Sequence, residues 1–506
     1  MPGVNLASIL DPHPDDAPAL ISRGRTTSFG DLRDQVASLR GGLIGLGVEP
    51  GDRVALVCAN NWYFVVSYFA ALGCGAEVVP LNPLSPPRAL QSQLAEVGAR
   101  IAVVGPSGQS ALGAIERSAL PDLTHIVTTS GDAGDGTVPI DHLVSQDPAP
   151  MVDRDDDDDT AVLMFTSGTA GAPRPAILSH GNLLANIDQV LSVPEVERVE
   201  GDVSLCVLPL FHIMGLNAIL GVALRAGSTV LLMERFDPQS AVEALDRHRV
   251  TVIAGAPAMW AAWATLPGLA PEAFRHVRVA SSGAAALSTD VVERMRDRFG
   301  VEIYEGYGLT EASPVVTSGL GMEPRPGSIG APLDGVEVRL VDPDGDDVLV
   351  GDEGELWVRG ANVFKGYLGD PEGQCHALTS DGWLRTGDIG VVDDEGYLFL
   401  VDRAKDLIIV SGFNVFPAEV EEVLVEHPAI EDCAVVGVPH PHSGEAVKAF
   451  VVTAQGRSVE EDDIIAFCAL HLPRYKCPEK VLFVDDLPHG LAGKVLRREL
   501  RDPIVT

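Results

Sequence analysis

The feature of this sequence that most constrains its fold is a repeated alternation of short apolar strands with helical segments. Residues 52–58 (DRVALVC) and 77–83 (EVVPLNP) have the character of buried strands, and the helical segment WYFVVSYFAALGCG lies between them. Strands separated by helices predict an α/β fold, in which a parallel sheet is covered by helices on both faces. The same pattern recurs at residues 100–104, 230–233, 250–253 and 277–280.

Two later changes of pattern predict further parts of the chain. From about residue 330, short strands alternate with Asp-Gly turns, which predicts a β-rich subdomain. Near residue 403 the pattern changes again to a compact α+β module, so we expect two domains, residues 1–402 and 403–506. The expected elements of this module are a helix opened by Pro417, strands at 433–438 and 446–453, and a helix with a capping box of Ser458 and Glu461.

The acidic composition argues against several kinds of partner. The 36 Lys and Arg residues against 72 Asp and Glu residues leave a formal net charge of −36. Such a surface repels nucleic acids and anionic lipids, so we expect neither as a general partner. The seven cysteines include no CxxC pair, which argues against a disulfide framework or a structural zinc site and favours a cytoplasmic protein.

One uncharged segment is long enough to cross a membrane. Residues 203–224 carry no formal charge when His212 is neutral. Because the segment also contains Pro209, Gly215 and Gly221, we interpret it as a strand, a loop and a buried helix. We therefore expect no transmembrane segment, and the N-terminus lacks the basic region of a signal peptide.

A turn rich in Ser, Thr and Gly follows the apolar strand at residues 161–165 and has the composition of a phosphate-binding loop. Glycines let backbone N–H groups approach phosphate oxygens, hydroxyl groups donate hydrogen bonds, and Arg174 supplies positive charge. The spacing is not that of a Walker A motif, and such a turn alone is weak evidence. Its candidate residues are Thr166, Ser167, Gly168, Thr169, Gly171 and Arg174.

The segment YEGYGLTE at residues 304–311 has residue types suited to a nucleotide with its cation. An aromatic ring beside two glycines can stack on a flat base, and Thr310 can donate a hydrogen bond to a phosphate. Glu311 offers the oxygen ligand that Mg²⁺ prefers.

Three shorter motifs in the last quarter of the chain add polar groups of the same kind. In RTGD, Asp388 can accept hydrogen bonds from ribose hydroxyls, and in DRAKD, Arg403 can bind the ribose or a phosphate. In LAGKVLR, the ammonium of Lys494 can neutralise charge on an α-phosphate and a carboxylate together. Each motif is weak alone.

In their order and separation, the five motifs resemble the core motifs of the adenylate-forming enzymes: acyl-CoA synthetases, luciferases and peptide-synthetase adenylation domains. The resemblance covers essentially the whole chain and includes PLFHIMG (209–215), SSGAAALS (281–288) and PRYKCPEKV (473–481). It implies a fatty acyl-CoA synthetase with an α/β fold. A large N-terminal adenylation domain would contain layered α/β subdomains and a β-rich subdomain, followed by a small mobile C-terminal α+β domain.

The resemblance also implies a two-step reaction that uses ATP, Mg²⁺ and CoA. A carboxylate attacks the α-phosphate of ATP to give acyl-AMP and pyrophosphate, and the thiol of CoA then attacks the acyl-adenylate. The implied partners are a carboxylic acid, ATP and CoA. A carrier protein as the acyl acceptor and a homodimer are left open.

Individual roles in the family carry over to matching positions of this chain. The residues implied in catalysis are Lys494, Thr310, Glu311 and His212, and those implied in binding Mg²⁺ are Thr166 and Glu311. The residues implied in binding ATP and CoA are the phosphate-loop residues above; Gly283, Ala284, Ala285, Glu305, Gly306, Tyr307 and Gly308 near the adenine; Asp388 and Arg403 at the ribose; Lys405 at the domain hinge; and Ser411, Gly412, Arg474 and Lys476 toward CoA.

The chain departs from the family pattern at two places. Arg174 and Pro175 stand where Lys and Gly are usual, which keeps the charge but stiffens the loop. Ala492 replaces the hydroxyl residue usual before the glycine of the last motif. We expect activity to survive both changes.

The acid itself is less constrained than the chemistry. Members of the family that activate amino acids place an Asp where this chain has His212, so an amino acid substrate is disfavoured. The Met and small residues implied around the acid suit a flexible apolar tunnel, which favours a medium- or long-chain fatty acid. The alternatives are a fatty acyl-AMP ligase that serves a carrier protein, and an aryl or other carboxylic acid–CoA ligase. The residues implied in binding the acid are Phe211, His212, Met214, Gly215, Ala256, Trp260 and Gly308.

Overall fold

The computed structural model divides into two compact units. The first contains Met1–Val338 and Val358–Arg385, and the second contains Arg339–Trp357 and Thr386–Thr506. The expected domain boundary between residues 402 and 403 stays a prediction. The residues that the structure describes are 5–129, 136–153, 158–166, 173–193, 201–369, 377–403, 408–410, 413–415, 417–440, 444–472, 474–489 and 495–501.

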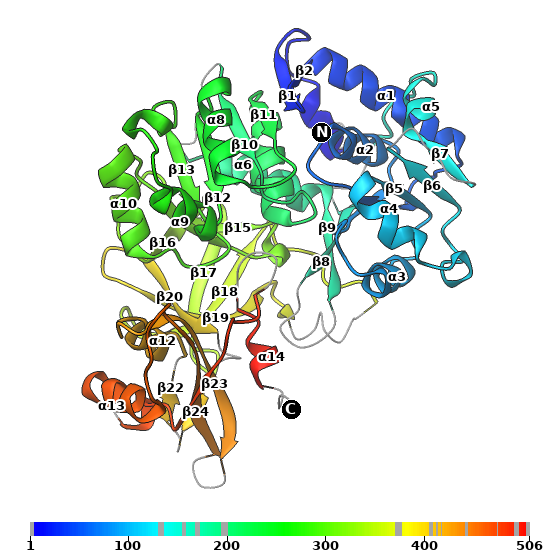
Figure 1. Cartoon of the computed structure of the whole chain (residues 1–506). Coiled ribbons are helices and arrows are strands. Elements are labelled where there is room, and N and C mark those ends of the chain that lie inside the picture. The colour runs from blue at the N-terminus through cyan, green and yellow to red at the C-terminus, as the bar shows by residue number, and fades with distance from the viewer. Residues whose placement is uncertain are drawn as a thin grey trace. The chain divides into compact units, whose positions relative to one another are not determined.

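The first unit contains a seven-stranded sheet, most of which is parallel, as the alternating pattern predicts (Figure 1). Its strand order is β7-β6-β5-β3-β4-β8-β9, and only the β8–β9 pair among these strands is antiparallel. The strands are β3 (Arg53–Val57), β4 (Glu77–Pro80), β5 (Ile101–Val104), β6 (His125–Thr128), β7 (Thr137–Pro139), β8 (Thr160–Thr166) and β9 (Arg174–Ser179).

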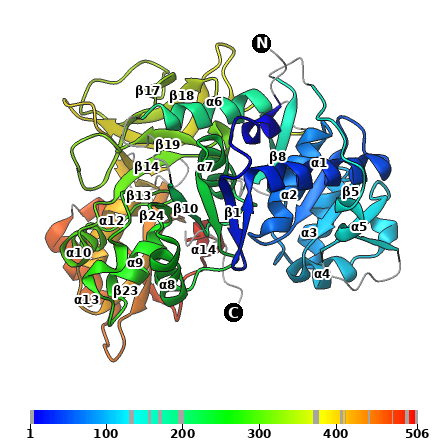
Figure 2. The same cartoon turned by 90° about the horizontal axis from the view of Figure 1, so that it is seen from above.

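Helices cover both faces of this sheet (Figure 2). Along β3, the side chains of Ala55 and Val57 belong to one core with α3 and α4, while Val54 and Leu56 point to the opposite face. All four are fully buried, as expected for a parallel strand with helices on both sides. The helices here are α1 (Phe29–Gly45), α2 (Trp62–Gly73), α3 (Pro87–Glu96), α4 (Pro106–Gly113) and α5 (Ile140–Val144).

The second sheet of the first unit is parallel at its centre. Its order within this unit is β16-β15-β14-β13-β12-β10-β11-β1-β2. Strands β10, β11, β12, β13 and β14 run parallel, and antiparallel strands join at both ends. The strands are β1 (Pro18–Ser22), β2 (Arg25–Ser28), β10 (Val203–Cys206), β11 (Thr229–Leu232), β12 (Val252–Gly255), β13 (Val279–Ser282), β14 (Tyr304–Gly308), β15 (Val315–Ser318) and β16 (Ser328–Pro332).

The two faces of this second sheet meet different helices. One face packs Leu205, Ile253 and Ala280 against the aromatic residues Trp260 and Trp263 in a large core. The opposite face meets the helices that follow the phosphate-loop hairpin and β10. The first group is α8 (Pro238–His248), α9 (Pro257–Thr265) and α10 (Thr289–Phe299), and the second is α6 (His180–Leu191), the π-helix η4 (Met214–Gly221) and α7 (Val222–Arg225).

The uncharged segment 203–224 has the structure that we predict from its Pro and Gly residues. It begins as β10, continues through a loop that contains Pro209, and ends in η4 and α7. Within the described ranges, no helix combines the length and apolar character that crossing a membrane requires.

Four further strands, of which β19 and β20 form an antiparallel pair, precede a small α+β sheet in the second unit. Strands β17 (Val336–Val341), β18 (Gly354–Gly360), β19 (Leu384–Val392) and β20 (Leu398–Arg403) are neighbours in that order. The α+β sheet has the order β22-β21-β24-β23, with β25 paired to β24. Its elements are β21 (Ile408–Val410), β22 (Phe413–Val415), α12 (Pro417–Val425), β23 (Ile430–His440), β24 (Gly444–Thr453), α13 (Glu461–His471), β25 (Lys480–Phe483) and α14 (Arg497–Arg501).

Candidate active site

Most of the predicted site residues of the first unit lie at the carboxyl edge of the second sheet. Strands β10, β12 and β13 end at Cys206, Gly255 and Ser282, and predicted residues follow directly after each of them. Because parallel strands end at the same edge, the loops after them meet there, where α/β sheets bind their ligands. The residues brought to this edge are Phe211, His212, Met214, Gly215, Ala256, Gly283, Ala284 and Ala285, with Glu305, Gly306, Tyr307 and Gly308 on β14.

The loop that carries His212 is held by a buried amide. Asn60, which is 4% exposed, donates from Nδ2 to the carbonyl of Leu208 at 2.7 Å and accepts from the N–H of Leu210 at 2.9 Å. A Cβ at Gly215 would overlap the carbonyl oxygen of Pro209, so the turn into η4 requires glycine. This packing places the first turn of the π-helix directly after His212.

His212 itself is an uncharged side chain at neutral pH. Its ring is accessible to water, but protein atoms surround it closely, and the lost solvation lowers its pKa from the ordinary value of 6.5. Its Nδ1 accepts a hydrogen bond from the N–H of Met214 at 3.3 Å. A neutral imidazole at this edge can therefore donate from Nε2 to a substrate oxygen.

The segment after β13 combines backbone strain with a firm support. Ala284 has a positive φ of 73°, a conformation that costs a non-glycine residue about 1 kcal/mol or more. Glu305 accepts a hydrogen bond from the N–H of Leu287 at 3.0 Å, which ties the segment to β14. Burial raises the pKa of Glu305, and its backbone hydrogen bonds partly oppose that rise. The methyl end of Met214 lies against Gly283.

Buried asparagines hold the segment that contains Thr310 and Glu311. Asn217 of η4 donates to the carbonyl of Ser313 at 2.7 Å, and Asn362 donates to the carbonyl of Ala312 at 2.9 Å. Both are almost completely buried, and such amides are kept in the interior by hydrogen bonds of this kind. These supporting asparagines cannot be recognised from the sequence, because an asparagine gives no sign of its distant partner.

Glu311 lies in a polar cluster with Arg174 and Tyr367. The hydroxyl of Tyr367 donates to Oε1 of Glu311 at 2.5 Å, and the guanidinium carbon of Arg174 lies 3.9 Å from the centre of the Tyr367 ring. Burial and the nearby Glu311 carboxylate raise the pKa of Tyr367, so the phenol stays protonated. Tyr367 is not among the residues predicted from the sequence, although its contacts Glu311 and Arg174 are.

Strands β8 and β9 frame the predicted phosphate loop. Thr166 and Arg174 are register partners at the open end of this hairpin, and the Thr166 hydroxyl is 3.4 Å from the carbonyl of Arg174. The hairpin therefore brings both ends of the loop together. Ser167, Gly168, Thr169 and Gly171 lie outside the described residues.

The second unit brings the two predicted ribose-binding residues together. Asp388 on β19 and Arg403 on β20 are directly opposed register partners in an antiparallel pair. Lys476, predicted to lie toward CoA, has a different contact, because its ammonium donates to both carboxylate oxygens of Glu419 at 2.6 Å. Arg474 begins the same short 3₁₀ turn. Lys405, Ser411, Gly412 and Lys494 are outside the part of the chain that the structure describes.

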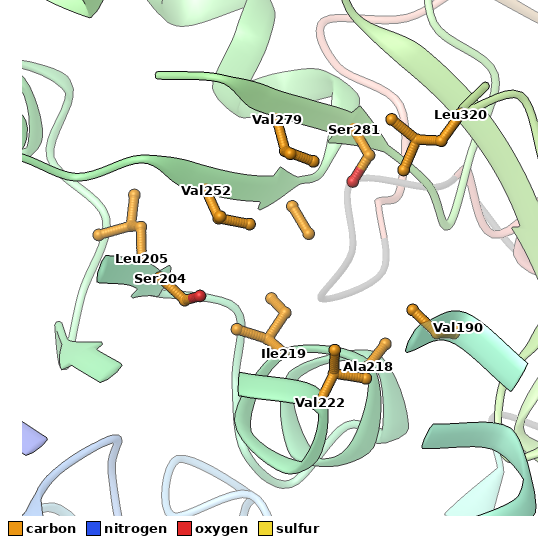
Figure 3. A pocket seen from close by; sticks show the side chains of 11 residues that line it. Val190, Ser204, Leu205, Ala218, Ile219, Val222, Val252, Val279, Ser281 and Leu320 are labelled. Atoms are coloured by element: carbon orange, nitrogen blue, oxygen red, sulfur yellow. The ribbon is translucent and has the colours of Figure 1, made fainter. Parts of the chain in front are cut away.

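A cavity lies between the second sheet and the π-helix (Figure 3). It encloses about 420 Å³ of empty space, which includes open solvent, and most of its walls are Val, Leu, Ile and Ala side chains from β10, β12, β13, α6, η4 and α7. The predicted acid-binding residues are not part of this wall. Trp260 lies within the core on the other face of the sheet, where its indole N–H donates to the carbonyl of Ser281 at 3.2 Å.

The arrangement of motifs at this edge agrees with family comparisons. The model of the family described as AMP-binding enzyme matches residues 9–368, and that described as AMP-binding enzyme C-terminal domain matches residues 419–494. The chain belongs to the AMP-binding enzyme family. It is an adenylate-forming enzyme of the acid–thiol ligase class, with the α/β fold of such ligases.

Individual members of the AMP-binding enzyme family resemble this chain over almost its whole length. A feruloyl-CoA synthase from an Amycolatopsis species is 37% identical, and the match covers 97% of this chain and 96% of the relative. A long-chain-fatty-acid–CoA ligase from Yersinia pestis is also 37% identical, with 96% and 92% covered. The crystal structure of ATP-bound MatB from Rhodopseudomonas palustris superposes with a TM-score of 0.90 at 32% identity, with 99% and 98% covered.

Proposed function

We propose that this ligase activates a predominantly apolar carboxylic acid to acyl-AMP with ATP and Mg²⁺, and then transfers the acyl group to CoA. Medium- and long-chain fatty acids are the first substrate class that we propose. The observation that carries this choice is the cavity behind the carboxyl edge of the second sheet, because its walls are mostly aliphatic.

Aryl acids are the second candidate class. Their support is the similarity to the feruloyl-CoA synthase, which equals the similarity to the long-chain-fatty-acid–CoA ligase at 37% identity. Both relatives are named for CoA thioesters, which supports CoA over a carrier protein as the acyl acceptor.

The residues proposed for Mg²⁺ have suitable ligand chemistry. Glu311 offers a carboxylate and Thr166 a hydroxyl, and Mg²⁺ commonly takes one or two carboxylates together with substrate phosphates and water. Within the described ranges there is no cluster of three His, Cys, Asp or Glu residues that could hold a metal without a substrate. When bound, Mg²⁺ would neutralise phosphate charge.

The other proposed roles follow the charge that develops during adenylation. Lys494 stabilises the pentavalent α-phosphate, and neutral His212 donates to an oxygen of the acid or phosphate. Glu305 and the Gly283–Ala285 backbone surround the adenine, while Asp388 and Arg403 bind the ribose. Lys405 serves as the hinge residue between the two half-reactions.

The first test is mass spectrometry of the products from ATP, Mg²⁺ and a panel of straight-chain and aryl acids, with and without CoA. We expect CoA thioesters and AMP, with the highest yield from acids that have an apolar tail. Acyl-AMP that persists in the presence of CoA would contradict CoA as the acceptor. A CoA thioester from short polar acids alone would contradict the apolar substrate class.

The Lys494→Ala variant separates the two half-reactions. Loss of one preorganised charge at the transition state costs about 10²–10³ in rate, so pyrophosphate release should fall by that factor. Thioester formation from supplied acyl-AMP should be nearly unchanged. A variant with normal pyrophosphate release would refute the proposed role of Lys494.

A further inference from the structure

The wall of the cavity contains a hydroxyl group that has no protein partner. Ser204 of β10 is only 2% exposed, and its Oγ has no hydrogen-bond partner among the described residues. A buried hydroxyl without a partner costs about 1–3 kcal/mol of stability. Other buried serines in this chain share this property, but Ser204 also lines the cavity.

The strand register places Ser204 at the deep end of the cavity. Ser204, Val252 and Val279 form one row across β10, β12 and β13, because Ser204 pairs with Val252 and Val252 pairs with Val279. Val279 lies four residues before Gly283 at the carboxyl edge, which is roughly 13 Å at about 3.3 Å per residue. Ser204 lies two strands, about 10 Å, to the side of Val279, so it is about 16 Å from Gly283. An acid with its carboxylate at that edge would therefore reach Ser204 with the far part of its tail.

The surroundings of Ser204 favour a ligand group over a trapped water molecule. Ser281 is the other cavity-lining residue with a polar side chain, and it lies two strands away and two rows nearer the edge. Two strand spacings are about 10 Å, so one water cannot bridge both hydroxyls. A buried water generally needs two to four polar partners, and among the cavity-lining side chains near it Ser204 supplies one such group. Figure 3 shows both hydroxyls on the sheet side of the cavity, opposite Ala218, Ile219 and Val222.

We propose that the acid activated by this enzyme carries a hydroxyl or keto oxygen on the far part of an otherwise apolar tail, and that Ser204 recognises it. A serine hydroxyl can donate to a ketone and can either donate to or accept from a hydroxyl. This inference rests on the proposed function and makes the substrate class narrower. It assigns Ser204 as a specificity-determining residue, separate from the groups at the carboxyl edge.

The test compares pairs of acids that differ only in the polar group. Straight-chain acids and ω-hydroxy acids of matched and increasing length are assayed by ATP-dependent pyrophosphate release, together with cinnamic and para-hydroxycinnamic acid. At the matching length, wild-type kcat/KM should favour the hydroxylated acid by about tenfold or more, since a site that hydrogen-bonds a substrate hydroxyl rejects the analogue without it. This comparison needs no variant.

Two variants then test whether Ser204 causes the preference for the hydroxylated acid. Ser204→Ala should lose the preference for the hydroxylated acid, because the substitution removes the hydroxyl that recognises the polar group and removes little volume. Ser228→Ala is the matched control, since Ser228 is also buried without a partner for Oγ but does not line the cavity. The control should keep the full preference.

The outcomes separate this inference from the proposed function. Equal kcat/KM for both members of every pair, or a preference that survives in Ser204→Ala, would overturn the role of Ser204 and leave the ligase activity intact. Absence of pyrophosphate release with every acid would overturn the proposed function and this inference with it.

Discussion

The two faces of the sheet formed by β10, β12 and β13 differ in what they do, although the same strands form both. On one face, Leu205, Ile253 and Ala280 are covered by large aromatic side chains and leave a closed core. On the other, Ser204, Val252 and Val279 form a row of small side chains beside a cavity. Because successive residues of a strand point to opposite faces, a few alternating positions separate a closed core from a face that borders a cavity.

The largest expected difference between the faces is in stability. Trp263→Ala removes a fully buried ring that contacts Trp260, Phe236 and Phe274, so the free energy of unfolding should fall by about 3–5 kcal/mol. Val252→Ala on the cavity face should cost clearly less, because its side chain already borders empty space. Urea unfolding measures both. Equal losses would mean that the cavity face is packed as tightly as the core.

Enlarging one alanine on each face should destabilise the protein on the core face and change substrate preference on the cavity face. Ala280→Leu adds volume to the closed core and should destabilise the protein by about 1–3 kcal/mol. Ala254→Leu adds the same volume to the cavity wall, so unfolding should change little while kcat/KM for long-tailed acids falls. The measurements are urea unfolding and pyrophosphate release over a series of acid lengths. The binding role of the cavity would be refuted by an Ala254→Leu enzyme with unchanged length preference.

A change at the carboxyl edge should alter nucleotide binding and leave acid selectivity unchanged. Tyr367→Phe keeps the ring beside Arg174 but removes the hydrogen bond to Glu311. Because one hydrogen bond to a charged group is worth about 1.5–3 kcal/mol, we expect KM for ATP with Mg²⁺ to rise tenfold or more. The thermal shift caused by ATP with Mg²⁺ should also decrease. Tighter ATP binding would instead show that Tyr367 competes with Mg²⁺ for Glu311, and Tyr63→Phe in α2 serves as the control.

The smallest expected effect is on pH dependence. The pKa of His212 lies below 6.5, so the imidazole is neutral at pH 7. It becomes protonated only when the pH falls below this lowered pKa. If neutral His212 donates to the substrate, kcat/KM should be constant above pH 6.5 and decline at lower pH. His212→Gln should be slower and lack this decline. An acid limb centred above pH 6.5 would contradict the lowered pKa.

Local patterns in the sequence predict many elements within one or two residues. The strand expected at 52–58 is Arg53–Val57, and the helix expected to open at Pro417 is Pro417–Val425. Ser28 caps α1, since its hydroxyl accepts from the N–H of Asp31 at 3.1 Å. Strand and cap signals are local, because they depend on side chains a few residues apart.

One local prediction is wrong because of a distant contact. The capping box of Ser458 and Glu461 does not form, since α13 begins at Glu461 after Glu460 and has no side-chain cap. The carboxylate of Glu461 instead accepts from the N–H of Val481 in β25 at 2.8 Å. A capping box needs this residue spacing, but the spacing alone does not ensure that the box forms. Here β25, twenty residues along the chain, binds the carboxylate of Glu461 instead.

The cysteines follow the expectation from their number and spacing. The six that lie in the described ranges are free and buried. Burial raises the pKa of Cys58 and of Cys206 to about 12, so both thiols stay protonated and serve as small apolar groups.

The sequence by itself determined the α/β fold class and the family, since both depend on the order of local patterns along the chain. It also predicts Asp388, Arg403, Glu311 and Arg174 as site residues, which stays a prediction. The tertiary structure alone decided that Tyr367 joins Glu311 to Arg174, and that Ser204 and Ser281 face one cavity. Those relations depend on strand register and on which face of a sheet a helix covers, and both arise from packing between residues far apart in the chain.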